Sequence, residues 1–340
     1  MDKTKPTLLV TGGAGFIGSN FVKYFTEKYP DKNVINVDML TYASSSAYIT
    51  SVPSENYHFI QGDIADPKLM MDSFETYNIT GVINFAAESH VDRSIINAQQ
   101  FITTNVYGTF NLIHCAKTVW EKNGTLSENR FHQISTDEVY GTLGASGSFR
   151  EDTPYNPRNP YSASKASADL IVQSFGHTYG MNVIISSCSN NYGPNQHKEK
   201  LIPTIISQAL NKQEIPIYGD GLQVRDWLYV MDHCQAIDLI FHHGKRLEKY
   251  NIGGNCEQPN ITIAKKVCAI LDRHPLTKER GFSHEQCITF TKDRLGHDRR
   301  YAVDDTKLRT ELHWEQEMTL DEGLEKTVDW YVRKWQPHIQ

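Results

Sequence analysis

The sequence predicts an α/β protein with a doubly wound parallel sheet and a smaller C-terminal lobe. Short β-branched runs alternate with longer helical patterns through the first 190 residues, which is typical of βαβ units. A glycine-rich turn follows the first of these runs. After about residue 190, clusters of Asn, Gly and Pro separate shorter elements. A chain of 340 residues is therefore expected to divide into two lobes.

The strands and helices of the first lobe are predicted from the length and composition of each segment. Short runs rich in Val and Ile fit strands that are buried on both faces. Strands are expected at residues 7–10, 34–38, 58–61, 82–85, 131–135 and 183–187. Helices are expected at residues 16–28, 67–77, 101–122 and 161–179. Each helix is long enough for the right-handed crossover that joins parallel strands.

The charge balance and the hydropathy pattern exclude several classes of protein. Lys and Arg total 34 against 40 Asp and Glu, for a net charge of -6, which disfavours a nucleic-acid partner. Glycines end the first apolar run before it is long enough for a signal-peptide core or a membrane span. We therefore expect a cytoplasmic protein with no membrane partner and no metal site.

The glycine-rich turn predicts a dinucleotide site. Gly12, Gly15 and Gly18 follow the first strand and open the first helix. Glycine there permits a tight turn, close approach of the backbone to a pyrophosphate, and close packing of the helix. Asp38 ends the second strand, and its carboxylate can accept a hydrogen bond from a ribose 2′-hydroxyl but would repel the 2′-phosphate of NADP. NAD is therefore the expected cofactor.

Asp63 and Ile64, at the end of the third strand, have two interpretations. They can contact the adenine, or Asp63 can be the N-cap of the helix that starts near Pro67. Together with the glycine turn, these strand ends make residues 1–190 a Rossmann-like, NAD-binding domain, to which some later segments return. Residues 191–340 would mainly form the lobe that closes over the carboxyl ends of the strands and binds substrate.

Tyr161 and Lys165 form the first candidate catalytic pair. They are four residues apart and lie on one face of the predicted helix. A tyrosine has an ordinary pKa of ~10, but a nearby lysine and a positively charged nicotinamide favour the phenolate, which can take a hydroxyl proton during hydride transfer. Lys165 would also hold the nicotinamide ribose.

Thr136, Asp137 and Glu138 follow the fifth strand and form the second candidate group. A plain redox enzyme of this fold needs only a small hydroxyl residue to bind the reacting oxygen. Two adjacent carboxylates therefore indicate additional acid–base chemistry. The alternative is structural, with Asp137 and Glu138 capping the next segment.

With these motifs, the sequence resembles the extended short-chain dehydrogenase/reductase family and, within it, the dTDP-glucose 4,6-dehydratases, over essentially its whole length. The resembling segments are residues 12–18, 85–94, 135–141, 161–165, 190–194, 199–203, 218–221, 225–228 and 293–301. The adjacent Asp and Glu separate the dehydratases from the epimerases of this family. The resemblance implies an enzyme that uses bound NAD to dehydrate a nucleoside-diphosphate hexose to its 4-keto-6-deoxy form. The substrate that the resemblance favours is dTDP-glucose.

The resemblance also implies a role for each catalytic candidate. Tyr161 takes the proton of the C4 hydroxyl, and Thr136 hydrogen-bonds that oxygen. Glu138 removes the C5 proton as general base, while Asp137, held protonated, protonates the departing C6 hydroxyl as general acid. Lys165 completes the expected catalytic set.

Further site residues follow from the resemblance alone. Around the cofactor it places Phe16, Ile17, Leu40, Thr41, Ala86, Ala87, Ser89, Thr104 and Asn191. Around the sugar nucleotide it places Ser89, His90, Asn190, Lys200, Leu201, Pro216, Tyr218, Arg225, Asn260, Arg294, His297 and Tyr301. Arg225 is suited to bidentate pairing with the pyrophosphate, the alternative being a surface ion pair with Asp226. The resemblance also suggests a homodimer formed by helices 101–122 and 161–179.

Two stretches depart from the pattern of the dTDP-glucose enzymes. Three serines at residues 44–46 replace Gly-Asn-Leu near the adenosine end of the site. Asn195, His197 and Lys198 replace Tyr, Phe and Pro next to the substrate. A UDP sugar such as UDP-glucose or UDP-N-acetylglucosamine is therefore an alternative substrate. Two further candidate functions are a 4-epimerase, which has no use for the carboxylate pair, and a non-catalytic NAD-binding protein.

Overall fold

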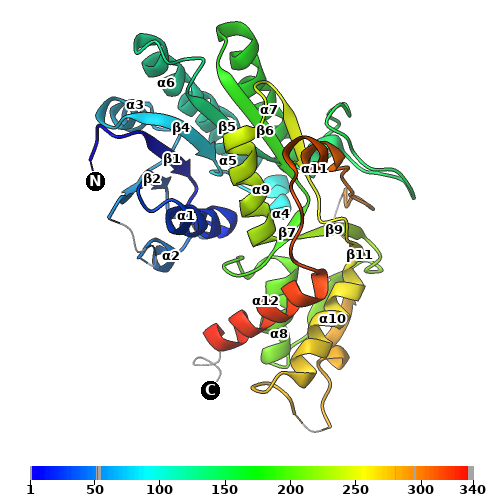
Figure 1. Ribbon diagram of the computed structural model, residues 1–340. Coiled ribbons are helices and arrows are strands. Elements are labelled where there is room, and N and C mark those ends of the chain that lie inside the picture. The colour runs from blue at the N-terminus through cyan, green and yellow to red at the C-terminus, as the bar shows by residue number, and fades with distance from the viewer. Residues whose placement is uncertain (1, 51, 53–54, 280, 294–295, 336–340) are drawn as a thin grey trace.

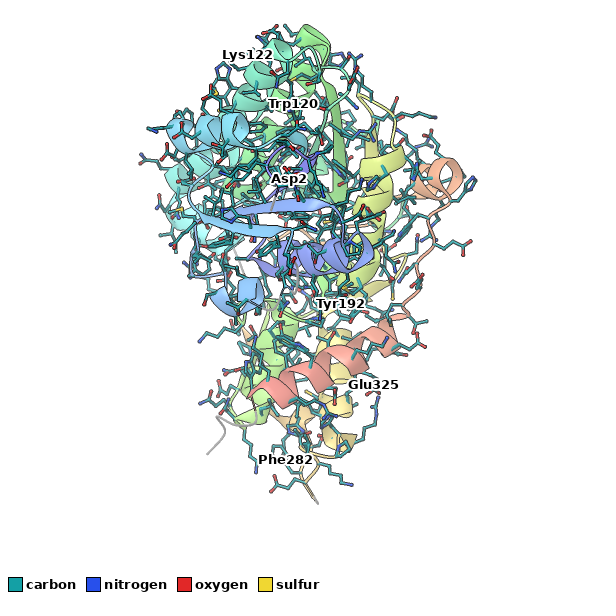
Figure 2. The ribbon with its side chains drawn as sticks, turned by 60° about the vertical axis from the view of Figure 1, so that its left-hand side comes forward. Asp2, Trp120, Lys122, Tyr192, Phe282 and Glu325 are labelled. Carbon is teal, nitrogen blue, oxygen red and sulfur yellow. The ribbon has the colours of Figure 1, made fainter. Side chains whose placement is uncertain are left out.

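The computed structural model describes all residues of the chain except 1, 51, 53–54, 280, 294–295 and 336–340. The chain forms a larger sheet domain and a smaller lobe (Figure 1). Figure 2 shows the two parts one above the other, with Trp120 and Lys122 in the sheet domain and Glu325 and Phe282 in the smaller lobe.

The sheet domain is built on a seven-stranded sheet with the order β10-β6-β5-β4-β1-β2-β3, in which the paired neighbours run parallel. The strands are β1 (Thr7–Thr11), β2 (Asn33–Asp38), β3 (Tyr57–Gln61), β4 (Ile79–Asn84), β5 (Arg130–Thr136), β6 (Asn182–Cys188) and β10 (Lys249–Ile252). The predicted fold class and its six strands are confirmed. The strand order reverses between β1 and β4, and open α/β sheets bind their ligands at such a point.

Helices cover both faces of this sheet. They are α1 (Phe16–Lys28) and α9 (Val230–His243) on one face, and α3 (Pro67–Thr76), α6 (Thr109–Lys122) and α7 (Pro160–Tyr179) on the other. Side chains alternate between the faces of a strand, so Leu8 and Val10 of β1 pack in a core with Phe21 of α1. Leu9 packs in a separate core with Phe74 of α3. The sheet is therefore buried on both sides, as its apolar runs predict.

The helix predicted at residues 101–122 is not one regular α-helix. It begins with α5 (Ala98–Phe101), widens into a π-helical segment, η1 (Ile102–Gly108), and continues as α6. Asn105 of η1 accepts a hydrogen bond from Glu88 N at 2.8 Å and donates to Ser164 Oγ at 2.8 Å. The predicted helix and its end at Lys122 are confirmed. Its π-helical segment was not predicted, because the amphipathic pattern does not reveal this polar link, which ties the loop after β4 to α7. π-helical turns often occur at functional sites.

The smaller lobe has its own core. Its elements are β7 (Asn190–Tyr192), β8 (Ile215–Tyr218), β9 (Val224–Tyr229), β11 (Glu257–Pro259), β12 (Ile288–Thr291), α8 (Leu201–Leu210), α10 (Asn260–Arg273), η3 (His284–Cys287) and α12 (Leu320–Trp335). Strands β11, β9 and β7 form one sheet, and β12 pairs with β8. Ile206, Ile263 and Leu324 bring the three α-helices together in one apolar cluster.

Several segments beyond residue 190 complete the sheet domain. Strand β10 pairs with β6 at the edge of the sheet, and Ile237 of α9 and Leu308 of α11 (Thr306–Leu312) join the core of Phe21. The division of the chain at residue 190 stays a prediction. The remaining short elements are α2 (Ser46–Thr50), α4 (Val91–Ile96) and η2 (Asp137–Tyr140). Within the described residues, every helix is too short or too polar to cross a membrane.

Candidate active site

A cavity of about 690 Å³ opens at the carboxyl ends of the sheet strands. It collects most of the side chains that the sequence singles out. Those that line it are Gly12, Gly15, Phe16, Ile17, Gly18, Asp38, Thr41, Asp63, Ile64, Ala86, Ala87, Ser89, Thr104, Thr136, Asp137, Glu138, Tyr161, Lys165, Asn190, Asn191 and Lys200. Residues from β1 to β7 thus meet at one edge of the sheet.

The glycine turn after β1 has the close contacts that only glycine allows. Gly12 has a φ of +69°, and a Cβ atom there would lie 2.7 Å from Ala86 N. A Cβ on Gly18 would lie 2.3 Å from Gly12 O. A Cβ on Gly15 would meet only Gly12 O, at 3.3 Å, and would otherwise fill space in the cavity. Among the described residues, no side chain caps the N-terminus of α1, so this turn fits a pyrophosphate placed against backbone N–H groups of the helix.

Asp38 lies at the end of β2 with its carboxylate held by three donors. Its Oδ2 accepts from Ala14 N at 2.9 Å, and its Oδ1 accepts from Leu40 N at 2.8 Å and Ser44 Oγ at 2.9 Å. Leu40 itself does not line the cavity and contributes through its backbone. Ser44, one of the serines that depart from the family pattern, therefore supports the carboxylate expected to contact the ribose.

The two interpretations of Asp63 can be separated. The N-cap of α3 is Asp66, whose Oδ1 accepts from Lys68 N at 2.9 Å and Leu69 N at 3.1 Å. Asp63 accepts from Ala65 N at 2.9 Å and, with Ile64, lines the cavity. The interpretation of Asp63 as the helix cap is wrong, because the chain makes one more turn before α3 begins.

Tyr161 and Lys165 project from the first turns of α7. Asn159 caps this helix and accepts from Ser162 N at 2.8 Å. Lys165 Nζ donates to Ile134 O at 2.6 Å, at the end of β5. Burial, followed by the charge of Glu138, raises the pKa of Tyr161 well above its ordinary value. Burial and Glu138 thus oppose the lowering of this pKa that is expected from Lys165 and a bound nicotinamide.

Thr136, Asp137 and Glu138 lie where β5 turns into η2. Thr136 is the N-cap, since its Oγ1 accepts from Glu138 N at 3.3 Å. The alternative that Asp137 and Glu138 serve as caps is therefore wrong. Glu138 Oε2 accepts from Asn159 Nδ2 at 3.4 Å, which places this carboxylate at the start of α7, near Tyr161.

Asp137 is an acid in an environment that disfavours its charge. Its side chain is 2% exposed, and its Oδ2 has no hydrogen-bond partner among the described residues. Burial, followed by the charges of Glu138 and Asp226, raises its pKa well above the ordinary value. A raised pKa keeps the carboxyl protonated and able to donate a proton.

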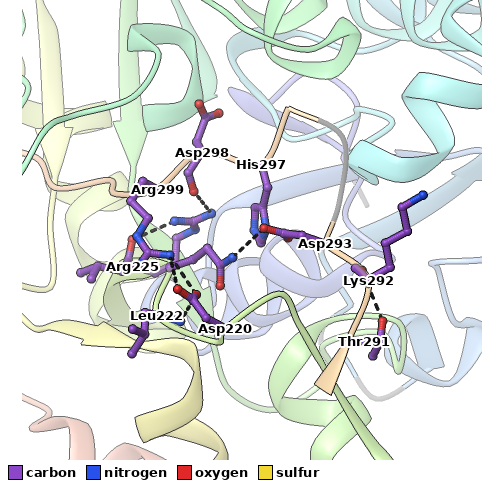
Figure 3. Close-up of polar contacts among 11 residues, drawn as sticks. Asp220, Leu222, Arg225, Thr291, Lys292, Asp293, His297, Asp298 and Arg299 are labelled. Carbon is purple, nitrogen blue, oxygen red and sulfur yellow. Dashed lines mark hydrogen bonds and ion pairs between the residues drawn. The ribbon is translucent and has the colours of Figure 1, made fainter. Parts of the chain in front are cut away.

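Arg225 and Tyr301 lie next to this catalytic edge without lining the cavity. Arg225 donates to Val224 O at 2.8 Å and to Asp298 O at 2.9 Å (Figure 3). Its guanidinium lies 4.3 Å from the ring centroid of Tyr301. The charge of Arg225 lowers the pKa of Asp137, against the larger effect of burial. The charge of Glu138 raises the pKa of Tyr301, after the effect of burial. Both side chains are therefore within electrostatic reach of the carboxylate pair.

Arg225 and Asp226 are not a surface ion pair. Both are buried, and Asp226 accepts from Gly254 N at 2.8 Å and Cys256 N at 2.7 Å, away from the contacts of Arg225. That interpretation was wrong because the two side chains point to opposite sides of β9.

The remaining candidates for substrate contacts lie at the border of the smaller lobe. His90 and Leu201 begin α4 and α8 beside the cavity. Four more lie farther out, around β8 and α10: Pro216, Tyr218, Asn260 and His297. His297 Nδ1 lies 2.6 Å from Asp293 Oδ1 (Figure 3). Arg294 lies outside the described residues.

Two carboxylates in the cavity were missed by the sequence interpretation. Glu88 is buried and accepts from Gln100 Nε2 at 2.8 Å. Glu199 Oε2 lies 3.7 Å from nitrogen atoms of His90, Arg93 and His197. Each directly precedes a predicted site residue in the segments that resemble the family. This adjacency in the sequence could have identified both carboxylates as site residues.

Comparison with known proteins agrees with this geometry. The family model described as GDP-mannose 4,6 dehydratase matches residues 9–327. A dTDP-glucose 4,6-dehydratase of Xanthomonas campestris pv. campestris is 48% identical over 96% of this chain and 93% of the relative. One from Haemophilus influenzae is 47% identical over 96% and 97%.

Solved structures give the same result. The dTDP-glucose 4,6-dehydratase of Bacillus anthracis, in complex with NAD, superposes with a TM-score of 0.86 at 40% identity and covers 99% of this chain and 100% of its own. A UDP-glucose 4-epimerase of Thermotoga maritima has a TM-score of 0.84 but is 27% identical, over 96% of this chain and 99% of its own. This chain belongs to the dTDP-glucose 4,6-dehydratase family.

Proposed function

We propose that this chain holds NAD in the cavity and dehydrates dTDP-glucose to the dTDP-linked 4-keto-6-deoxy sugar. The observation that carries the proposal is the adjacent pair Asp137 and Glu138 at the end of β5, in the same cavity as Tyr161 and Lys165. An epimerase or a binding protein has no chemical use for two more acids at this edge. The dehydratases among the relatives also share more sequence with this chain than the epimerase does.

The residues after the first three strands would hold NAD, which would supply the hydride acceptor for sugar C4 and the hydride donor for C6. The glycine turn before α1 receives the pyrophosphate. Asp38 accepts a hydrogen bond from a ribose hydroxyl, and Asp63 and Ile64 border the adenine. Tyr161 and Lys165 lie at the opposite end of the cavity, where the nicotinamide ribose would contact them.

Tyr161 acts as the base for the C4 hydroxyl, with Thr136 as a hydrogen-bond partner of the same oxygen. Its raised pKa means that the phenol needs positive charge nearby to lose its proton. Lys165, one helical turn away, is the cation that α7 offers for this purpose.

The carboxylate pair performs the elimination. A ketone at C4 acidifies the neighbouring C5–H, which Glu138 removes. Asp137 donates its proton to the C6 hydroxyl as it leaves as water. Glu138 would return the proton to C5 when C6 receives the hydride, which gives the 4-keto-6-deoxy sugar. The raised pKa of Asp137 supports this assignment, because a general acid must carry its proton at neutral pH.

The proposed activity is tested by product mass. Purified protein is incubated separately with dTDP-glucose, UDP-glucose and UDP-N-acetylglucosamine, and the products are analysed by mass spectrometry. We expect dTDP-glucose to lose one water. If only a UDP sugar loses water, that sugar is the substrate and the assignment of dTDP-glucose is wrong. Conversion without a change of mass would indicate an epimerase.

We further propose that the protein is a homodimer. Five exposed apolar side chains lie on η1, α6 and α7: Ile102, Tyr107, Phe110, Leu170 and Tyr179. Leu170 is 56% exposed and Ile102 50% exposed. Adjacent helices with apolar outer faces suit a two-fold interface. The cytoplasmic location predicted from the sequence stays a prediction.

Sedimentation velocity tests the dimer. Leu170→Glu is expected to give a monomer at concentrations where the parent protein is a dimer. Leu276→Glu changes a similarly exposed leucine in the smaller lobe and should leave the dimer intact. A parent protein that sediments as a monomer, or a dimer unaffected by the first substitution, would reject this interface.

A further inference from the structure

Asp169 is a buried carboxylate that neither the motifs nor the proposed mechanism uses. It lies on α7, one turn beyond Lys165, and its side chain is inaccessible to solvent. Its Oδ2 accepts from Ser135 Oγ at 2.5 Å and from Tyr155 OH at 3.1 Å. Ser135 directly precedes the catalytic Thr136, so Asp169 joins the catalytic helix to the catalytic strand.

The second oxygen of Asp169 is not engaged in this way. Its Oδ1 is buried without a hydrogen-bond partner among the described residues. Lys165 precedes it by four residues on the same helix face, and Lys165 Nζ donates to Ile134 O, the carbonyl next to Ser135. The ammonium and the carboxylate are thus attached to consecutive residues of β5. A buried charge without a counter-charge is costly. Among the described residues Lys165 and Asp169 form no direct ion pair within 4 Å, so each charge acts on the other across the end of β5.

We propose that Asp169 is a positioning residue that keeps Lys165 cationic and fixed against the end of β5. Asp169 touches neither substrate nor cofactor in this scheme and acts through Lys165. The inference rests on the role proposed for Lys165 beside Tyr161.

The surroundings set the direction of each effect. Burial lowers the pKa of Lys165, and the charge of Asp169 is the largest influence that raises it. Burial raises the pKa of Asp169 to about 6, opposed first by Lys165 and then by Ser135, Tyr155 and Lys249. The other titratable groups facing the pair are Cys188 of β6, Tyr140 of η2, and Lys249 of β10, whose Nζ lies 4.8 Å from the Tyr155 ring centroid.

The first test compares variants that remove the charge with variants that keep it. In Asp169→Asn the ammonium of Lys165 loses its counter-charge, so we expect the alkaline limb of kcat against pH to move down by about one pH unit. We also expect less NAD to co-purify per protomer. Ser135→Ala keeps the carboxylate and should leave the alkaline limb in place. Asp72→Asn, which removes an exposed partner of Lys68, is the matched control for charge.

Tyr155→Phe provides a test that does not depend on the folding of Asp169→Asn. It removes a hydrogen bond that lowers the pKa of Asp169. Asp169 should then protonate at higher pH, so the acidic limb of kcat should move up while the alkaline limb stays. An acidic limb at the parent position would overturn the proposal.

A double-mutant cycle shows whether Asp169 acts through Lys165. In a Lys165→Met background, Asp169→Asn should produce no further loss of kcat or of NAD content. An undiminished second loss, or an Asp169→Asn variant with the parent's alkaline limb and NAD content, would overturn the proposal. Failure of the parent protein to convert dTDP-glucose would instead reject the proposed function, and the NAD content of the same variants would still test the link between Asp169 and Lys165.

Discussion

The carboxyl edge of the sheet and the surface beside β9 are stabilised by different kinds of interaction. At the sheet edge, Asp137 is 2% exposed and Lys165 is 5% exposed. On the surface beside β9, Arg299 and Asp220 form an ion pair with side chains 54% and 52% exposed (Figure 3). A buried polar group is held in place because losing its hydrogen bond costs free energy of desolvation. An exposed ion pair contributes only about 0–1 kcal/mol to the stability of the fold. The candidate catalytic groups therefore lie among buried, hydrogen-bonded side chains, and the Arg299–Asp220 pair lies in the more exposed of the two regions.

The largest effect is expected at the buried edge, from Glu138→Gln. The amide cannot remove the C5 proton, so kcat should fall about 10³-fold. Oxidation at C4 should still proceed, and the absorbance of reduced nicotinamide should accumulate when dTDP-glucose is added. Absorbance and product mass are measured together. Formation of the dehydrated product at the rate of the parent protein would contradict the assignment of Glu138 as the base.

At the same edge, Asp137→Asn should lower activity but increase stability relative to the parent protein at high pH. The amide cannot protonate the C6 hydroxyl, so kcat should fall about 10²-fold. The pKa of Asp137 is higher in the folded protein than its ordinary value. Its contribution to stability is therefore full at low pH and is lost as the pH rises through the raised pKa. The neutral Asn avoids that loss.

The measurement is the free energy of unfolding of both proteins by urea titration across neutral and alkaline pH. The variant should gain stability relative to the parent as the pH rises. A difference that does not change with pH would show that Asp137 is not a protonated buried acid.

Arg225→Lys tests the border between the two regions. The guanidinium is buried and donates in two directions, and lysine cannot reproduce the forked geometry. We expect KM for dTDP-glucose to rise about tenfold to a hundredfold, with a smaller change in kcat. Arg299→Lys is the matched control in the exposed region and should change KM less than about threefold. Equal effects of the two substitutions would remove the distinction between the regions.

The same contrast explains which features could be predicted from the sequence. The strands and α1 could be predicted because continuous apolar runs and a glycine turn mark them in short segments of the sequence. Tyr161, Lys165 and the carboxylate pair were found because each group lies within five consecutive residues. Residues this close in the sequence remain close together in the folded protein.

Features that depend on distant contacts could not be predicted in this way. Asn105, in the π-helical segment η1, reaches Glu88 and Ser164, and the period of the apolar residues gives no sign of these contacts. Some later segments are expected from the sequence to return to the first domain, but β10 could not be identified as the one that extends the sheet. Asp169 acquires its partners Ser135 and Tyr155 only when α7 packs on β5.

The smallest effect we predict concerns Ser44, where the chain departs from its family. Its hydroxyl is one of three donors to Asp38, so Ser44→Ala should weaken NAD binding by about 1 kcal/mol, or about fivefold in Kd, without changing kcat at saturating NAD. Calorimetry on protein stripped of nucleotide measures this change. Ser45→Ala is the control, since Ser45 contacts Ala14 through its backbone N–H. If both substitutions leave Kd unchanged, the two backbone donors are sufficient to hold Asp38, and the serines at residues 44–46 replace the family residues without affecting the cofactor site.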